Sequence, residues 1–169
     1  MRAVSLLSLL FAAVAAASSA WPAALPQIRL SDPLGKEFTG TQLSQKGVVV
    51  LVTAPNLSQG GAQEAWDAAF RGAKRDPDGP AVVILEDMTQ SWFRPLVLGR
   101  MKESYKPGAS IVLLLDEAGT TRKAFGVPND TTVAFAFSAD GKLAAVETAR
   151  ATVERAQKLL TAAAGSTAR

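Results

Sequence analysis

The strongest hydrophobic pattern of the chain lies between Gly47 and Phe70. Val48 to Val52 is an unbroken aliphatic run, too short for a typical helix, that suits a strand covered on both faces. A polar, glycine-bearing turn follows it. Apolar residues then recur at helical spacing, at Ala62, Trp66, Ala69, Phe70 and Ala73. The stretch therefore predicts a buried strand, a turn and an amphipathic helix.

The remaining patterns predict a hairpin before this unit and further strands and helices after it. Strands are expected over 27–30, 36–38, 81–85, 111–115, 131–137 and 142–147. Helices are expected over 41–45 and 121–125, from about Arg94 to just before Pro107, and after an N-cap at Thr152. This order predicts an α/β fold, in which one mixed sheet has helices on both faces and an N-terminal β-hairpin.

Composition narrows the possible chemistry. The chain has 169 residues, of which 48% are hydrophobic, and a formal net charge of +3. These values fit one globular domain and argue against a dedicated nucleic-acid binder. The sequence contains no Cys and no His. Thiol redox chemistry, disulfides and thiolate metal sites are thereby excluded, and the commonest general base is missing. We expect no cofactor and no metal site.

The N-terminal segment predicts export. Arg2 precedes an apolar run from Leu6 to Ala17, and Ser18-Ser19-Ala20 offers small residues for cleavage before Trp21. The run is shorter than the roughly 20 residues of a spanning helix, so we expect 1–20 to be a signal peptide and no stable membrane insertion after cleavage. Without Cys there is no cysteine to lipidate. The expected product is periplasmic or secreted, with an extended lead-in over 21–26, one domain over 27–164 and a flexible tail over 165–169.

Three phrases of the sequence resemble the thioredoxin-like (redoxin) superfamily. Ile28 to Phe38 (IRLSDPLGKEF) resembles the N-terminal hairpin of exported redoxins. Val48 to Pro55 (VVVLVTAP) resembles the strand before their active-site turn, and Phe125 to Leu143 (FGVPNDTTVAFAFSADGKL) is similar to their last hairpin. The resemblance implies a three-layer sandwich with a mixed central sheet. The segment from Trp92 to Tyr105, with the strand after it, also looks like small periplasmic proteins of the YtfJ type.

The catalytic residues of the family are missing. Where the family has Cys-x-x-Cys, this sequence has Leu57-Ser58-Gln59-Gly60, so Leu57 and Gly60 stand at the thiol positions. The family's cis-proline before the last hairpin matches Asp130, and Pro128 lies two residues earlier. The resemblance therefore implies the fold without its usual redox reaction.

The turn after the first buried strand remains a candidate ligand site. Amides at a helix N-terminus bind anions and carboxylates. The candidate ligand-binding residues are Asn56, Leu57, Ser58, Gln59, Gly60, Asp130 and Thr131. The alternative is that Asn56 or Ser58 only caps the helix while the glycines relax a tight turn.

Four acidic residues directly follow two of the predicted strands: Glu86 and Asp87 after one, and Asp116 and Glu117 after the other. The carboxyl ends of parallel strands often bind ligands, and carboxylates bind hard cations such as calcium. The acids have no regular ligand spacing, so we expect solvated turn residues instead.

A segment rich in aromatic and basic residues is a candidate partner surface. Trp92, Arg94, Arg100 and Lys102 are placed to meet an acidic partner or anionic headgroups. The alternative is an amphipathic helix with its aromatic residues in the core and its basic residues in solvent, which the helical spacing favours.

These observations predict a non-catalytic binding or accessory protein of the cell envelope. Its partner would be an envelope protein or a small anionic ligand, and not a nucleic acid. Two alternatives stay open. One is an enzyme that uses non-thiol groups at the turn, such as Asn56, Ser58 and Asp130. The other is a degenerate relative of peroxiredoxins or thiol-disulfide oxidoreductases with a residual antioxidant role.

Overall fold

The computed structural model describes residues 21–107 and 110–165. The expected signal peptide over 1–20 lies outside the described residues, as does the expected tail beyond Gly165. Within the described residues, none of the helices is long and apolar enough to cross a bilayer.

A seven-stranded sheet forms the centre of the molecule, in the order β2-β1-β5-β4-β3-β6-β7. Its strands are β1 (Arg29–Ser31), β2 (Glu37–Thr39), β3 (Val48–Thr53), β4 (Ala81–Asp87), β5 (Ile111–Asp116), β6 (Val133–Phe137) and β7 (Leu143–Glu147). The strands β3, β4 and β5 are parallel, and the other neighbouring pairs are antiparallel. The mixed sheet and the N-terminal hairpin predicted from the sequence are both confirmed.

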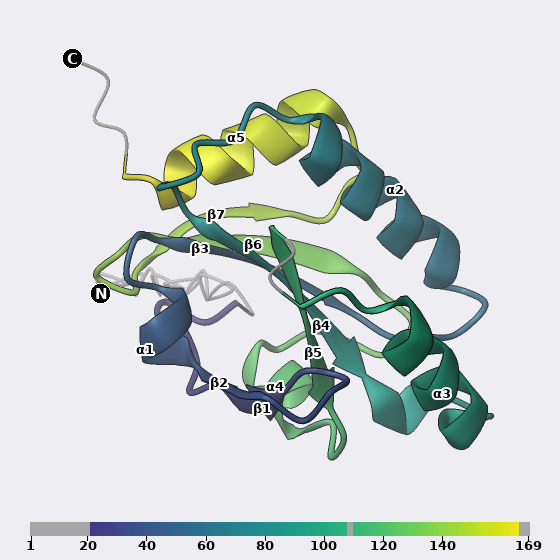
Figure 1. Ribbon diagram of the computed structural model, residues 1–169. Coiled ribbons are helices and arrows are strands. Elements are labelled where there is room, and N and C mark those ends of the chain that lie inside the picture. Colours follow the sequence, from purple (N-terminus) through teal and green to yellow (C-terminus); the bar gives the residue numbers. More distant parts are fainter. Residues whose placement is uncertain (1–20, 108–109, 166–169) are drawn as a thin grey trace, which may run out of the picture.

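Helices cover both faces of this sheet (Figure 1). The α-helices are α1 (Gly40–Leu43), α2 (Gly60–Gly72), α3 (Arg94–Ser104), α4 (Thr120–Ala124) and α5 (Val153–Ala163), and a 3₁₀ turn, η1 (Met88–Gln90), follows β4. The helices α2 and α5 lie side by side on one face, while α1 and α4 lie on the other, and the β1–β2 hairpin extends the sheet beyond β5. Thr152 caps α5 by accepting a hydrogen bond from the Arg155 amide, as expected.

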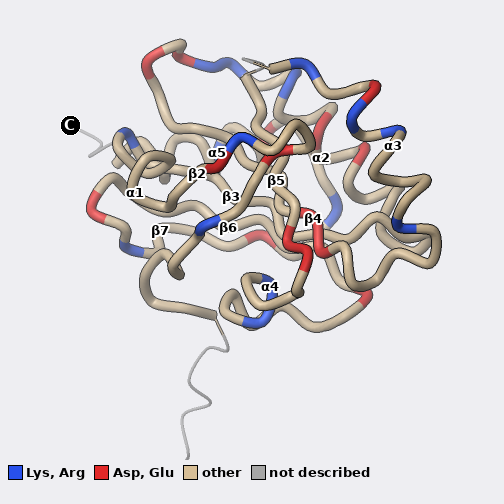
Figure 2. Tube along the Cα trace, turned by 60° about the horizontal axis from the view of Figure 1, so that its bottom comes forward, with Lys and Arg blue, Asp and Glu red and all other residues tan. Residues whose placement is uncertain are grey.

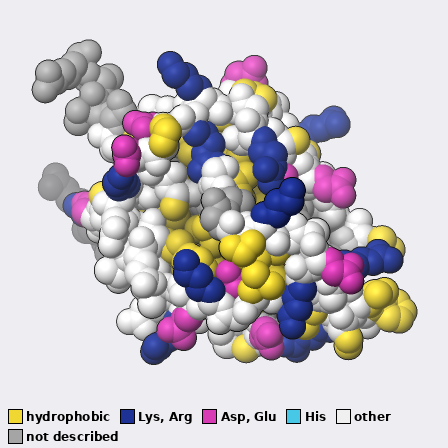
Figure 3. Space-filling model, viewed as in Figure 1, with side chains coloured by type: hydrophobic (Ala, Val, Ile, Leu, Met, Phe, Trp, Pro, Cys, Tyr) yellow, Lys and Arg dark blue, Asp and Glu magenta, His cyan; other side chains and the backbone are white. Residues whose placement is uncertain are grey.

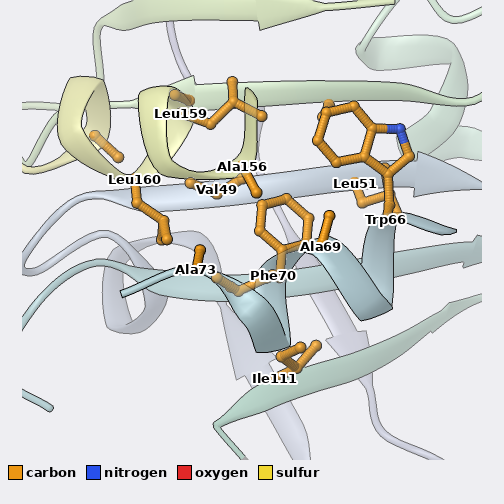
Figure 4. Close-up of a cluster of buried hydrophobic side chains, with 14 of the residues drawn as sticks. Val49, Leu51, Trp66, Ala69, Phe70, Ala73, Ile111, Ala156, Leu159 and Leu160 are labelled. Carbon is orange, nitrogen blue, oxygen red and sulfur yellow. The ribbon is translucent and has the colours of Figure 1, made fainter. Parts of the chain in front are cut away.

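Two hydrophobic cores result, because the strand β3 is buried on both faces. Trp66 and Phe70 of α2 pack with Leu159 of α5 over one face, as Figure 4 shows. Phe125 and Phe135 lie in the core of the opposite face, with ring centroids 5.2 Å apart. Full burial of one such aromatic side chain contributes about 1.5–3 kcal/mol to folding.

The lead-in over 21–26 is attached to the sheet. The amide of Leu25 donates to the Gly141 carbonyl oxygen at 2.8 Å, and Trp21 meets the edge of Phe135 with ring centroids 5.4 Å apart. The lead-in thus places Trp21 beside the turn that follows β3, where it lines the same cavity as Ser58.

Candidate functional site

The turn between β3 and α2 contains Leu57 and Gly60, which the sequence resemblance aligns with the thiols of thioredoxin-like proteins. Leu57 is fully solvent-exposed, at 105% of its reference area, and Gly60 is the first residue of α2. Between them, Gln59 is buried, with its side chain turned into the protein. The two thiol positions therefore hold an apolar side chain in water and a residue without a side chain.

Asn56 organises this turn. Its Oδ1 accepts the Gln59 amide at 3.0 Å and the Ser58 hydroxyl at 2.8 Å, and its carbonyl oxygen accepts the Gly60 amide at 2.9 Å. The N-cap position of α2 is Gln59, and no side chain caps the helix there. The side-chain capping alternative is thus wrong in detail, because the Asn56 side chain binds the turn before the helix, and only its carbonyl oxygen reaches a helical amide, that of Gly60.

The loop before β6 lies against the turn. Ser58 Oγ donates to Asp130 Oδ1 at 3.2 Å, so the structure brings together two residues that are 72 positions apart in the sequence. Asp130, which the sequence resemblance aligns with the family's cis-proline, has a φ of 58°, in the left-handed region that Asp tolerates better than most residues. All peptide bonds of the described ranges are trans. The neighbouring Thr131 hydroxyl donates to the Pro128 carbonyl oxygen at 2.7 Å.

Gln90 connects the turn, the loop and η1, and no sequence pattern singled it out. Its Oε1 accepts from Gln59 Nε2 at 3.3 Å, from the Asp130 amide at 3.4 Å and from Asn56 Nδ2 at 3.5 Å. Its own Nε2 donates to Asp87 Oδ2 at 2.6 Å. One amide side chain therefore couples the turn to a buried acid at the end of β4.

A second residue missed at the sequence level is Arg122 of α4, which is only 1% exposed. Its Nη2 donates to the carbonyl oxygens of Pro128 and Thr131, at 2.5 and 2.6 Å. Asp116 accepts the Arg122 amide at 2.9 Å, and Asp87 Oδ2 lies 3.8 Å from the guanidinium Nε. Burial lowers the pKa of Arg122, and the carboxylates around it act in the opposite direction. Figure 2 shows the acidic ends of β4 and β5 beside the basic positions of α4.

Three of the four strand-end acids are buried, so the expectation of solvated turn residues is wrong for Glu86, Asp87 and Asp116. Asp87 and Asp116 are buried because they face Arg122. Glu86 is different, because neither of its carboxyl oxygens has a hydrogen-bond partner. Burial raises the pKa of Glu86 to about 7, although the Gln63 amide acts to lower it. Glu117 alone is exposed, and it pairs with Arg94.

The calcium alternative finds no support in the geometry. In the ranges 21–107 and 110–165, no three acidic side chains are placed to hold a metal ion. Asp87 already has the guanidinium of Arg122 as its counter-charge, and Asp116 lies close enough to oppose the lowering of the pKa of Arg122 by burial. Asp87 and Asp116 therefore hold Arg122, which in turn binds the loop before β6.

A groove of about 640 Å³ runs along the turn, the start of α2 and the loop before β6. Its lining contains apolar residues, Trp21, Ala62, Ala65, Trp66, Val133 and Ala151, together with polar ones, Ser58, Gln59, Asp130, Thr131, Thr132 and Arg150. Five of the seven proposed ligand residues belong to the turn, and Ser58, Gln59, Asp130 and Thr131 line this groove. Asn56, Leu57 and Gly60 are absent from the lining.

The contacts of Ser58 determine what the groove offers chemically. Ser58 Oγ has one proton, which it shares between Asn56 Oδ1 at 2.8 Å and Asp130 Oδ1 at 3.2 Å. An activated nucleophile needs an adjacent base or a lowered pKa, and Asp130 brings a carboxylate to this contact. The polar residues of the groove are also suited to hydrogen bonding with a bound molecule.

The proposed partner surface on α3 is exposed. None of the residues of α3 is buried, and the preceding Trp92 and Phe93 are 94% and 69% exposed. The alternative in which the aromatic residues enter the core is therefore wrong. Arg94, Arg100 and Lys102 lie on the same segment, and Arg94 is partly covered by its pairing with Glu117.

Sequence comparison gives no relatives: neither the models of known protein families nor the curated proteins match the chain. Solved structures do match. DsbF of MTB is 21% identical, with 84% of this chain and 98% of that chain covered and a TM-score of 0.61. An exposed lipoprotein thioredoxin of Streptococcus pneumoniae is 16% identical, with 79% and 98% covered and a TM-score of 0.60. A secreted Mycobacterium tuberculosis disulfide oxidoreductase homologous to DsbE of E. coli is 14% identical, with 80% and 96% covered and a TM-score of 0.58.

The order of the strands and the position of the turn define an α/β protein whose central strand leads into a site beside its last hairpin. The matches with solved structures identify this architecture as the thioredoxin-like fold. The fold expected from the sequence is thus confirmed, and the chain that adopts it has no cysteine.

Proposed function

We propose that the protein is an exported, non-catalytic binding protein of the cell envelope, which holds an extended segment of a partner protein in the groove beside Ser58 and Asp130. The observation that carries the proposal is the groove itself. It keeps an ordered turn, an ordered loop and an apolar lining although the thiol positions are Leu57 and Gly60. Two of the similar structures are described as a secreted and an exposed protein, which supports export.

A protein segment fits the groove better than a small anion does. The start of α2 offers amides and Arg150 lines the groove, but the Asp130 carboxylate lies beside Ser58 at the start of the helix and opposes an anion there. The apolar residues of the groove, with Trp21, Ala65 and Trp66 among them, suit the side chains of an extended segment. The polar residues offer hydroxyl and carboxylate groups for its backbone amides.

The test is a binding measurement with a blocked groove. Ala65→Trp places an indole in the groove, while Ala144→Trp introduces the same side chain at an exposed position of β7 outside it. Peptides from envelope proteins would be screened by fluorescence anisotropy against the purified protein. We expect binding to the wild type and to Ala144→Trp, and at least a tenfold loss for Ala65→Trp. Equal peptide affinity of the two variants would contradict the proposal.

An enzyme with non-thiol groups is the second candidate, and the contact between Ser58 and Asp130 favours it. Under this alternative, Ser58→Ala would abolish turnover of a substrate that still binds.

A residual antioxidant role is tested by peroxide consumption. Because the chain has no thiol, we expect consumption at the rate of the buffer, and a faster rate that survives purification would favour that role.

A further inference from the structure

One end of the molecule carries exposed apolar side chains that project from the surface. Trp92, Phe93 and Leu96 are 94%, 69% and 56% exposed, and they lie where η1 leads into α3. Leu57 belongs to the same end, since Asn56 beside it contacts Gln90 of η1. We call Leu57, Trp92, Phe93 and Leu96 the aromatic end. Figure 3 shows hydrophobic side chains projecting at the lower right, where Figure 1 has α3.

The positive charge of the chain is concentrated beside this end. The segment 92–106 contains four basic residues, Arg94, Arg100, Lys102 and Lys106, and one acidic residue, Glu103. Its formal charge of +3 equals that of the whole sequence, so the remainder of the chain is neutral on balance. The carboxylate of Glu117 pairs with Arg94, whereas Arg100, Lys102 and Lys106 are exposed.

The shape of the aromatic end limits what it can contact. Its four residues line neither the groove nor the large cavity beside the β1–β2 hairpin. A partner protein would have to supply a pocket for each projecting side chain, whereas a bilayer interface accepts projecting Trp, Phe and Leu side chains without a preformed pocket. Basic residues on the same segment as such side chains match the negative charge of anionic headgroups.

The helix that carries these residues is held in place at both ends. Arg94, at its start, pairs with Glu117 after β5. After its end, Tyr105 contacts Asp32 of the hairpin turn, and burial together with this contact raises the pKa of Tyr105 to about 12. The aromatic end is thus presented by a fixed element, so docking would need no folding of α3.

We propose that the protein docks peripherally on a membrane surface rich in anionic lipid, with the aromatic end in the interfacial layer and Arg100, Lys102 and Lys106 at the headgroups. The groove lined by Ser58 and Asp130 adjoins this end through Gln90, so a docked molecule would present its groove near the bilayer. This inference is independent of what the groove binds.

The test is vesicle binding by the chain as purified from cells. Vesicles of phosphatidylcholine mixed with phosphatidylglycerol would be compared with vesicles of phosphatidylcholine alone, by co-sedimentation. Arg100→Glu combined with Lys102→Glu removes the charge match, and Lys74→Glu combined with Lys123→Glu is the control, because it changes the net charge equally at exposed positions of other elements. All variants share the same N-terminus, so their differences report on the mutated surface.

We expect the wild type and the control pair to bind the mixed vesicles with dissociation constants within about threefold, and the Arg100 and Lys102 pair to bind at least tenfold more weakly. Trp92→Ser combined with Phe93→Ser should also lose binding. In the wild type, brominated lipid should quench the fluorescence of Trp92, and this quenching should be absent from Trp92→Phe. Thermal melting of every variant would show that it is folded.

Three results would overturn the proposal. One is the absence of any preference for the mixed vesicles over phosphatidylcholine alone. Another is equal loss of binding in both charge-reversed pairs, which would assign binding to net charge. The third is that the protein fails to bind vesicles and instead binds poly-glutamate or dimerises through Trp92 and Phe93 as its concentration rises. Either behaviour would assign the aromatic end to a protein partner.

Discussion

Replacing Arg122 with Met tests whether the buried ionic cluster holds the site together. Met replaces the unbranched hydrocarbon part of the Arg122 side chain in α4 but lacks its guanidinium, and Arg122 is only 1% exposed. It deletes the hydrogen bonds to the carbonyl oxygens of Pro128 and Thr131. It also leaves Asp87 and Asp116, both buried, without their cation.

Removing one partner of a buried charge cluster costs about 3–5 kcal/mol, since the remaining charge stays desolvated. For a domain of this size each kcal/mol lowers the melting temperature by roughly 2–4 °C, so Arg122→Met should melt about 6–20 °C below the wild type. The neighbouring Lys123 is the control. It is exposed on the same helix, and Lys123→Met should change the free energy of unfolding by no more than about 0.5 kcal/mol.

The assay is urea denaturation followed by the fluorescence of the three Trp residues, with thermal melting as a second probe. Arg122→Lys should lie between the wild type and Arg122→Met, because Lys keeps the charge but not the planar, forked guanidinium. If Arg122→Met and Lys123→Met were equally stable, the buried cluster would contribute nothing, and the proposed anchoring of the loop before β6 would be refuted.

Two further predictions concern stability. Burial raises the pKa of Glu86 to about 7, above its unfolded value, so the folded state holds the proton more tightly and stability should fall as pH rises from about 4.5 to about 7. The free energy of unfolding should fall by about 3 kcal/mol over this pH range, as measured by urea titrations, and Glu86→Gln should remove this pH dependence. If the wild type showed no such pH dependence, the Glu86 carboxyl would be in contact with water. Gly47 has a φ of +83°, and a Cβ there would lie 2.0 Å from the Ala163 carbonyl oxygen, so Gly47→Ala should cost at least about 3 kcal/mol or prevent folding. Gly61→Ala, with open space around its Cβ, should change stability by less than about 1 kcal/mol, and equal effects of the two substitutions would contradict this reasoning.

The fold was predictable because its signals are local. The run from Val48 to Val52 has no polar residue, and a strand without a polar face must be covered on both sides. The spacing of Trp66 and Phe70 places both side chains on the face of α2 that meets α5. Each of these patterns lies within one element, so no knowledge of distant contacts is needed to interpret it.

The buried polar residues were not predictable in the same way. Arg122 stands in a short polar stretch, TTRKA, which by itself is typical of a solvent-exposed helix. Its burial depends on Asp87, 35 positions earlier, and on the carbonyl oxygens of the loop that follows. The strand-end acids were misjudged for the same reason, since an acid whose counter-charge comes from another element has no local signature.

The error at α3 has a different physical cause. Helical spacing there was taken as evidence that the aromatic residues enter the core. Trp92 and Phe93, however, precede the helix, which begins at Arg94, so they do not share its periodic face. The half-buried side of α3 consists of Val97, Leu98 and Met101 instead. Periodicity indicates which residues share a face only after the helix boundary is known.

The way in which the site is held supports the proposed binding function. A thioredoxin-like turn that only filled space would need no buried guanidinium, because a Met or Leu side chain would pack there without a desolvated charge. Instead, Arg122 fixes two carbonyl oxygens of the loop that carries Asp130, and Gln90 ties that loop to the turn at Asn56. These contacts fix the position of Asp130 relative to Ser58, although neither residue touches the hydrophobic cores. A groove whose polar residues are positioned at this energetic cost, in a chain without thiols, is better suited to holding a partner than to oxidising one.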